Sequence, residues 1–325
     1  MRAFVTGGSG FVGGHLIRRL VADGAEVVAL ARSDAAADRV EDLGAVSHRG
    51  DLSSAGRLAK GLEGAAVTFH CAGVVGSNVE KAEAWRVNVE GTRNVVKAAR
   101  DAGVRRLVHV STESVLHDGR PLDGVDETYP IPTRGHLSHY AASKAEAERI
   151  VLAANGDGLE TIAIRPRLVW GPEDGAWLPG LVEKVDLGVF RWVDGGSHLG
   201  STCHVYNLVE ALVLAANSGK PGAVYFVTDG PPRTFREFAG AYLATAGVEV
   251  GEGSVPGWLM RAVGATLETV WRFLPTRSWP PVNRVEAYMV SHPQVFDDTL
   301  ARRELGYRPV ISVEEGLEEL VSEAG

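Results

Sequence analysis

Short apolar runs alternate with longer amphipathic segments from residue 1 to about residue 170. The apolar runs predict strands at residues 2–6, 26–31, 45–49, 66–70, 106–110 and 160–165. The segments between them have the three- and four-residue apolar spacing of helices, and the longest cover residues 78–101 and 138–154. This alternation predicts an α/β fold with a parallel, doubly wound sheet.

A glycine-rich turn follows the first predicted strand. Gly7 allows a tight turn, Gly10 lets the backbone approach a pyrophosphate, and Gly13 lets the next helix pack closely on the strand. The amides and dipole at the start of that helix favour an anion. A structural turn is the alternative, but the strand–turn–helix setting predicts dinucleotide binding in a Rossmann-type fold.

The end of the second predicted strand bears on the choice of dinucleotide. An acidic residue often holds the adenosine ribose there, whereas this chain has Arg32 and Ser33, and Asp34 is expected to begin the next helix. A guanidinium matches phosphate oxygens, so Arg32 and Ser33 favour the 2′-phosphate of NADP, with NAD as the alternative. A merely solvated Arg32 is the other interpretation.

Tyr140 and Lys144 stand four residues apart and therefore share one face of a predicted helix. A free phenol has a pKa of about 10, and a nearby ammonium and a nicotinamide charge both favour the phenolate. In the reducing direction the same phenol donates its proton to the developing alkoxide. Such a pair is also common on surface helices, but the upstream glycine turn favours the chemical interpretation.

Hydroxyl groups follow the predicted strand at 106–110. Thr112, with Ser111 and Ser114 beside it, offers a hydroxyl that can bond a substrate oxygen next to Tyr140. These residues also suit an ordinary turn at a strand exit.

The alternation of strands and helices ends after Gly171-Pro172. One more helix and strand are expected at about 205–228, and the rest of the second half is mostly helical in pattern. We therefore expect a dinucleotide-binding domain made of 1–172 plus about 205–229. A smaller, mostly helical substrate lobe then comprises about 173–204 plus 230–325.

Composition narrows the possible partners and compartments. The 325 residues carry a net charge of −8 without a basic run, which argues against nucleic-acid binding. Two cysteines, Cys71 and Cys203, fit a reduced, cytoplasmic compartment. The chain begins directly with a strand, so no signal peptide is expected, and no apolar stretch is long enough to span a bilayer.

Residues 255–279 form an amphipathic segment with unusual aromatic content, including Trp258, Trp271 and Phe273. Three interpretations are open: core of the smaller lobe, wall or lid for an apolar substrate, or a helix that makes weak peripheral contact with a membrane. Arg261, Arg272 and Arg277 would supply the basic face of such a membrane helix.

The remaining chemical signals are weaker. His136 and His139 lie three residues apart, but a metal site needs more ligands, so no metal is predicted. Cys71 is expected to be a small buried residue. Arg165 and Arg167 flank Pro166, and each fits either a contact to an anionic group or a structural ion pair.

Taken together, the motifs resemble those of the extended short-chain dehydrogenase/reductases, the epimerase/dehydratase superfamily, and within it the 3β-hydroxysteroid dehydrogenase-like branch. The resemblance covers essentially the whole chain. It rests on residues 6–13, Gly50-Asp51-Leu52, His70-Cys71-Ala72-Gly73, Asn88-Val89-Glu90-Gly91-Thr92, Ser111 to Val115, Tyr140 to Lys144, Arg165 to Pro172, Phe296-Asp297 and Leu305 to Pro309.

The resemblance implies a set of site residues. Thr112, Tyr140 and Lys144 would be the catalytic triad. The residues implied for the cofactor are Gly7, Ser9, Gly10, Phe11, Val12, Gly13, Arg32, Ser33, Asp51, Leu52, Ala72, Gly73, Asn88, Tyr140, Lys144, Pro166 and Val169. Two residues depart from the family pattern: Tyr206, where relatives often have Asp, and Glu113, where small residues are common.

The resemblance also implies an activity. We expect an NAD(P)-dependent oxidoreductase that interconverts a hydroxyl and a ketone on an apolar substrate, such as a sterol or a long-chain 3-oxo or 3-hydroxy acid. The alternatives are a nucleotide-sugar epimerase or dehydratase with tightly held NAD, and a dinucleotide-sensing protein without chemistry. Many relatives form homodimers through the helices near 78–101 and 138–154, so a homodimer is expected.

Overall fold

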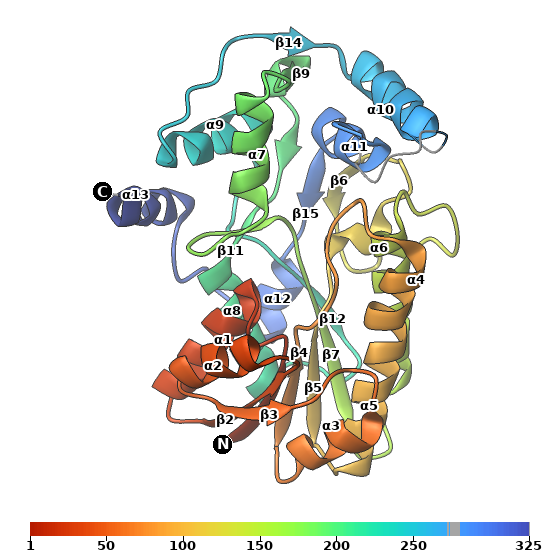
Figure 1. Cartoon of the computed structure of the whole chain (residues 1–325), viewed down its shortest axis with the longest axis vertical. Coiled ribbons are helices and arrows are strands. Elements are labelled where there is room, and N and C mark those ends of the chain that lie inside the picture. The colour runs from red at the N-terminus through yellow and green to blue at the C-terminus, as the bar shows by residue number, and fades with distance from the viewer. Residues whose placement is uncertain (272, 274–279, 325) are drawn as a thin grey trace.

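A seven-stranded sheet forms the centre of the protein, shown in a computed structural model that describes residues 1–271, 273 and 280–324 (Figure 1). Its neighbouring strands are all parallel. In spatial order they are β3 (Val46–Arg49), β2 (Glu26–Ala31), β1 (Arg2–Thr6), β4 (Val67–His70), β5 (Arg106–Val110), β7 (Glu160–Pro166) and β12 (Val224–Val227). The predicted α/β class and the six predicted strands are confirmed.

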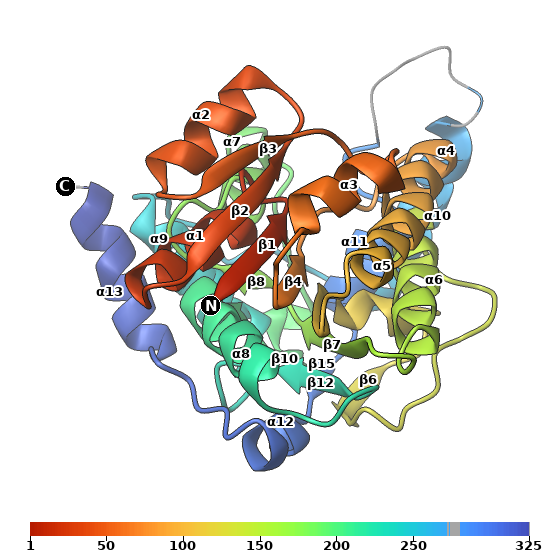
Figure 2. The ribbon, with the colours of Figure 1, turned by 90° about the horizontal axis from the view of Figure 1, so that it is seen from below.

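Helices cover both faces of this sheet, as expected for a doubly wound fold (Figure 2). One face carries α1 (Phe11–Ala22), α2 (Asp34–Asp42) and α8 (Val205–Asn217), and the other carries α3 (Ala55–Leu62), α5 (Gly91–Asp101) and α6 (His139–Ala153). Successive side chains of a strand point to opposite faces. Thus Val5 packs with Leu16 of α1, while its neighbour Phe4 packs with Leu58 of α3.

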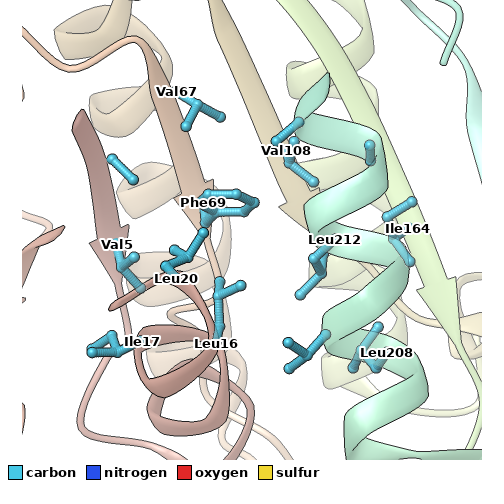
Figure 3. Close-up of a cluster of buried hydrophobic side chains, with 14 of the residues drawn as sticks. Val5, Leu16, Ile17, Leu20, Val67, Phe69, Val108, Ile164, Leu208 and Leu212 are labelled. Atoms are coloured by element: carbon cyan, nitrogen blue, oxygen red, sulfur yellow. The ribbon is translucent and has the colours of Figure 1, made fainter. Parts of the chain in front are cut away.

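The core on the α1 and α8 side is drawn in Figure 3. Val5, Phe69, Val108 and Ile164 come from four adjacent strands and are fully buried beneath the flanking helices. Burying one such side chain on folding contributes about 1.5–3 kcal/mol to the free energy of unfolding. This layer therefore fixes the carboxyl edge of the sheet, where β1, β4, β5 and β7 end.

The smaller lobe lies beyond that edge (Figure 1). It is mostly helical, with α7 (Trp177–Asp186), α9 (Phe235–Thr245), α10 (Gly257–Trp271), α11 (Arg284–Ser291) and α13 (Val313–Ala324), while the short α12 (Thr299–Glu304) lies against β12. A four-stranded sheet in the order β13 (Arg233–Thr234), β10 (Leu199–Gly200), β15 (Gln294–Phe296) and β6 (Leu122–Val125) runs through it. The pairs β14 (Ser254–Val255) with β9 (Trp192–Val193) and β11 (Cys203–His204) with β8 (Val169–Trp170) complete the strands. A segment from the first half of the chain, β6, thus pairs with a strand near its end.

The predicted helix over 78–101 is interrupted. It consists of α4 (Lys81–Ala84), a π-helical turn over Trp85–Glu90, and α5. A π turn widens the helix locally and is often found at functional sites.

The aromatic segment at 255–279 begins with α10, and residues 272 and 274–279 lie outside the described residues. In α10 only Gly257 and Gly264 are buried, and Trp258 is 65% exposed. The interpretation of this helix as lobe core is therefore wrong. Within the described part of the chain, no helix has the length and apolar character needed to cross a membrane.

The glycine turn gives a test of packing. A Cβ on Gly13 would lie 2.1 Å from the Gly7 carbonyl oxygen, whereas a Cβ on Gly14 meets only ordinary contacts, the nearest at 3.5 Å. We expect Gly13→Ala to lower the free energy of unfolding by about 1–3 kcal/mol. The matched control Gly14→Ala should raise it by about 0.5–1 kcal/mol, because alanine is the better helix former.

Urea unfolding of both variants measures the difference. Equal effects of the two substitutions would contradict the close approach between Gly13 and Gly7.

Candidate active site

The glycine turn between β1 and α1 has the geometry of an anion cradle. Gly7 has φ of +75°, and a Cβ there would lie 2.7 Å from the Ala72 amide nitrogen. The Gly10 amide donates to the Gly7 carbonyl at 3.0 Å. No side chain caps α1 and its first turn has no acidic residue, so the amides and dipole of this helix start suit a pyrophosphate.

The other residues expected at the cradle lie in the same turn. Ser9, Phe11 and Val12 are partly exposed, as a ligand contact requires. The Phe11 ring packs edge-on against His15, with 5.7 Å between ring centroids, and Val12 lies against the core. The packing of Phe11 and Val12 thus fixes the position of the turn relative to α1.

At the end of β2, the structure places Arg32 and Ser33 beside each other. Arg32 is exposed and forms no ion pair within residues 1–271, 273 and 280–324. Ser33 caps α2 by accepting a hydrogen bond from the Ala36 amide at 3.2 Å. Asp34 begins α2 as expected, and it pairs with Arg49. Arg32 is therefore the group that remains available to a ligand.

The residues expected near the adenine and along the cofactor are anchored by backbone contacts. Asp51 accepts from the Ser53 amide and hydroxyl, which lowers the pKa of its carboxyl. The carbonyl of Leu52 accepts from Asn94 at 2.7 Å, and its side chain packs on Gly91 of α5. The Ala72 amide donates to the Thr6 hydroxyl at 3.3 Å.

Thr112, Tyr140 and Lys144 come together at the carboxyl end of β5. Thr112 directly precedes the 3₁₀ turn Glu113–Leu116 that follows β5, and its hydroxyl lies beside the Tyr140 phenol. Tyr140 and Lys144 occupy successive turns at the start of α6, which Ser138 caps. The Lys144 ammonium donates to the Val110 carbonyl at 2.6 Å and to His109 Nε2 at 3.4 Å.

The environment shifts both titratable groups of this triad. Burial lowers the pKa of Lys144 to about 8, against the opposing charge of Glu148. Loss of water contact and the Glu113 carboxylate raise the pKa of the Tyr140 phenol. The expected lowering of the Tyr140 pKa is therefore not produced by the chain itself, and at neutral pH the phenol keeps its proton and is suited to act as an acid.

Asn88 projects from the π turn and joins three segments. Its amide accepts from the Val74 amide at 2.9 Å, donates to the Val74 carbonyl at 3.1 Å and donates to the Ser143 hydroxyl at 3.0 Å. A Cβ on Gly73 would lie 3.1 Å from Asn88 Oδ1. The loop after β4 is thus fixed to α6 at Ser143, between Tyr140 and Lys144.

His70, a buried histidine to which the sequence motif assigned no role, links the strand ends. His70 Nδ1 lies 2.8 Å from the Thr6 hydroxyl, and Nε2 lies 2.9 Å from the Thr92 hydroxyl, which itself donates to the Asn88 carbonyl. Burial lowers the pKa of His70 to about 3, so the ring is neutral. Its Nε2 therefore carries the hydrogen and its Nδ1 accepts from Thr6, which leaves every group paired.

Arg165 forms a structural ion pair rather than a ligand contact. Its guanidinium binds the Glu148 carboxylate at 2.5 and 2.9 Å, and Ser111 donates to the same carboxylate at 2.6 Å. Glu148 and Arg165 are fully or almost fully buried. These bonds join α6, which carries Tyr140 and Lys144, to the end of β5 and to β7. Sequence reasoning missed Glu148, because its partner lies on another element.

Glu113 lies against Thr112 at the end of β5. It is 4% exposed, and its Oε2 accepts from the Thr112 hydroxyl at 2.7 Å. Burial raises the pKa of this carboxyl, partly offset by the charge of Arg167. Arg167 is itself buried and donates to the Ser201 carbonyl at 2.7 Å.

The segment after β7 joins the two lobes. Pro166 ends β7, and Val169 lies in β8, which pairs with β11. Asn207 accepts from the Val310 amide at 2.6 Å and donates to Asp229, which also binds the Trp170 indole at 2.7 Å. The unusual Tyr206 donates to Glu319 of α13 at 2.9 Å, so it adds a contact at the lobe junction.

His136, which precedes α6, and His139, which begins it, have different surroundings. His136 Nε2 lies 3.1 Å from the Val115 carbonyl, while His139 is exposed. Across the described ranges, no group of three or more His, Cys, Asp or Glu side chains is arranged to hold a metal ion.

Comparison with known proteins identifies the family. The model of the 3-beta hydroxysteroid dehydrogenase/isomerase family matches residues 4–256. The chain belongs to this family. It therefore lies within the extended short-chain dehydrogenase/reductases, which confirms the resemblance drawn from the motifs, and it is an NAD(P)-dependent oxidoreductase of the short-chain type.

Curated relatives align over nearly the full length. The chain is 45% identical over 320 residues to the 4-hydroxy-2-methyl-3-oxo-4-farnesyl-3,4-dihydroquinoline-1-oxide ketoreductase of Stigmatella aurantiaca, covering 98% of this chain and 96% of that protein. It is 36% identical over 333 residues to a 2-alkyl-3-oxoalkanoate reductase of Stenotrophomonas maltophilia, covering 98% of both.

A solved structure shows the same architecture. A double mutant of the dTDP-glucose 4,6-dehydratase of Streptomyces venezuelae, with NAD bound, superimposes with a TM-score of 0.76 at 26% identity. The match covers 99% of this chain and 96% of that chain.

The buried ion pair behind the triad predicts a large stability effect. Glu148→Ala leaves the Arg165 charge buried without its partner, and we expect the free energy of unfolding to fall by about 3–5 kcal/mol. The control Glu90→Ala removes an exposed partner of Arg93 and should lower the free energy of unfolding by less than about 1 kcal/mol. Chemical denaturation of both variants measures this, and similar losses would contradict the structural role of the buried pair.

Proposed function

We propose that the protein reduces the ketone of an apolar substrate to a hydroxyl, or catalyses the reverse reaction, with Thr112, Tyr140 and Lys144 as its catalytic residues. The observation that carries this proposal is that the Thr112 hydroxyl and the Tyr140 phenol lie side by side at the carboxyl end of β5, with Lys144 one helical turn from Tyr140. The two relatives are named for reducing a farnesyl-bearing ketone and 2-alkyl-3-oxoalkanoates. We infer a substrate of that apolar kind, sterol-like or a long-chain 3-oxo acid.

Tyr140, Thr112 and Lys144 have separate roles in this proposal. When bound, the nicotinamide supplies the hydride. Tyr140 gives its phenolic proton to the substrate oxygen as that oxygen gains charge, and Thr112 orients the same oxygen. Lys144 has three N–H donors, two of which bind Val110 and His109, so one is left for the nicotinamide ribose.

The same proposal assigns the cofactor contacts. The amides from Gly7 to Gly13 would hold the pyrophosphate, and Asp51 and Leu52 would flank the adenine. Ala72, Gly73 and Asn88 would line the path to the ring, with Pro166 and Val169 beside the nicotinamide. This assignment is supported by the close approach at the glycine turn and by the bonds that fix Asn88 and Ala72.

Two further expectations belong to this proposal. We infer a homodimer built on α5 and α6, which lie against each other and carry Arg93 and Glu146 on their outer side. The cytoplasm is the proposed compartment, because Cys71 and Cys203 are free thiols.

The alternative is a nucleotide-sugar epimerase or dehydratase, and the likeness to the dehydratase structure supports it. Such an enzyme needs cations in the smaller lobe for a diphosphate, with Arg191, Arg233 and Arg236 as candidates. Arg233 pairs with Glu314, Arg236 pairs with Glu252, and Arg191 donates to nearby carbonyls. These existing partners favour the reductase.

Removal of the phenol tests the chemistry. Tyr140→Phe should lower kcat for reduction of a long-chain 3-oxo ester by about a hundred- to ten-thousand-fold, because the proton donor is lost, while NADPH still binds. Tyr225→Phe is the control, since its hydroxyl bonds Glu304 on α12. Steady-state kinetics with fluorescence titration of NADPH separates the two effects, and an active Tyr140→Phe would refute the proposal.

The choice of cofactor depends on Arg32. We expect the wild-type protein to prefer NADPH, and Arg32→Ala to lower kcat/KM for NADPH by about 10- to 100-fold through loss of a charged hydrogen bond. Activity with NADH should change little. Arg39→Ala is the control, because that arginine is already paired with Glu173. A wild-type preference for NADH would refute the NADP assignment.

A further inference from the structure

The Thr112 hydroxyl makes two hydrogen bonds in the structure. It donates to Glu113 Oε2 at 2.7 Å and accepts from the Ser114 amide at 3.2 Å, and the Tyr140 phenol lies beside it. A hydroxyl has one hydrogen and two lone pairs. Since its only hydrogen goes to Glu113 and one lone pair accepts from Ser114, the hydroxyl oxygen keeps one further lone pair. In this arrangement Thr112 has no hydrogen to offer a substrate oxygen.

A protonated Glu113 changes this arrangement. Its O–H then donates to the Thr112 oxygen, which also accepts from Ser114, so both lone pairs are used. The Thr112 hydrogen is released from Glu113 and is free to point at the substrate oxygen beside Tyr140. No bond to carbon is made or broken, and the Glu113 proton stays on its carboxyl.

The surroundings of Glu113 bear on which form it takes. Burial favours the neutral acid and raises the pKa of the carboxyl, whereas the Arg167 guanidinium and the Thr112 bond favour the carboxylate. His117 Nε2 lies 3.9 Å from Oε1, but burial lowers the pKa of His117 to about 3, so the ring is neutral. The other titratable groups that face the carboxyl are Tyr140, Tyr288 and Cys203.

We propose that Glu113 is a positioning residue that sets the direction of the Thr112 hydrogen bond, and that its protonated form is the one competent for ketone reduction. This inference rests on the proposed roles of Thr112 and Tyr140. The inference predicts the direction of the pH dependence. The kcat/KM for reduction is highest below the pKa of Glu113 and falls about tenfold per pH unit above it.

Glu113→Gln tests the inference. An amide N–H donates to the Thr112 oxygen as the protonated acid does, but it does not titrate. The variant should therefore lose the fall in kcat/KM that Glu113 causes at rising pH, while keeping wild-type activity at low pH. Glu113→Ala, which can neither donate nor accept, should lower kcat more than it raises KM.

Glu127→Gln is the matched control. Burial also raises the pKa of Glu127, but its carboxylate accepts from the Phe226 amide at 2.8 Å on the edge strand β12. This variant should keep the wild-type pH profile. A Glu113→Gln variant that keeps the wild-type profile, or that is folded but inactive at every pH, would overturn the inference.

Infrared spectroscopy of the protein without cofactor gives a readout independent of turnover. The C=O stretch of a protonated carboxylic acid should disappear over the pH range in which wild-type kcat/KM falls. It should shift in Thr112→Val, where the acid loses its acceptor. A carboxyl that stays ionised throughout the working pH range would refute the inference, even if Glu113→Gln fails to fold.

The two variants Tyr140→Phe and Glu113→Gln distinguish a failure of the proposed function from a failure of the role of Glu113. If Tyr140→Phe still reduces ketones, the proposed function fails whatever Glu113 does. If Tyr140→Phe is inactive while Glu113→Gln keeps the wild-type pH profile, only the role of Glu113 fails.

Discussion

The buried pair between Glu148 and Arg165 is the constraint on which the site depends. It joins α6 to β7, and the Ser111 hydroxyl binds the same carboxylate from the end of β5. Tyr140 and Lys144 lie on this helix, and Thr112 lies next to Ser111. Their mutual placement therefore follows from one buried carboxylate with three donors. Because such a charge is costly to bury alone, the helix and both strands stay together or separate together.

The sequence predicted the elements that depend on residues close together along the chain. The buried parallel strands are continuous apolar runs, and the turn at Gly7 and Gly13 requires residues without a side chain, so both were visible in the chain. The spacing of Tyr140 and Lys144 was informative for the same reason. The strand β5 could be placed, and with it Thr112, because its apolar residues stop abruptly at Ser111.

Features that depend on a distant partner could not be predicted. A charged residue such as Glu148 in a helix ordinarily faces water, and only the fold shows that Arg165 meets it. The π turn that carries Asn88 differs from an α-helix by a local widening that the apolar spacing does not record. The direction of the Glu113 side chain depends on Arg167 and His117, which no local pattern connects to it.

The pairing of β6 with β15 has a consequence for how the protein acquires its structure. The smaller sheet needs a strand from the first half of the chain and another made when synthesis is nearly finished. Contacts between such distant segments require a long loop to close, and proteins that depend on long-range strand pairing fold slowly. Until β15 has been synthesised, β6 lacks its partner in the smaller sheet, so a chain cut between the halves would leave both fragments incomplete rather than yield two autonomous domains.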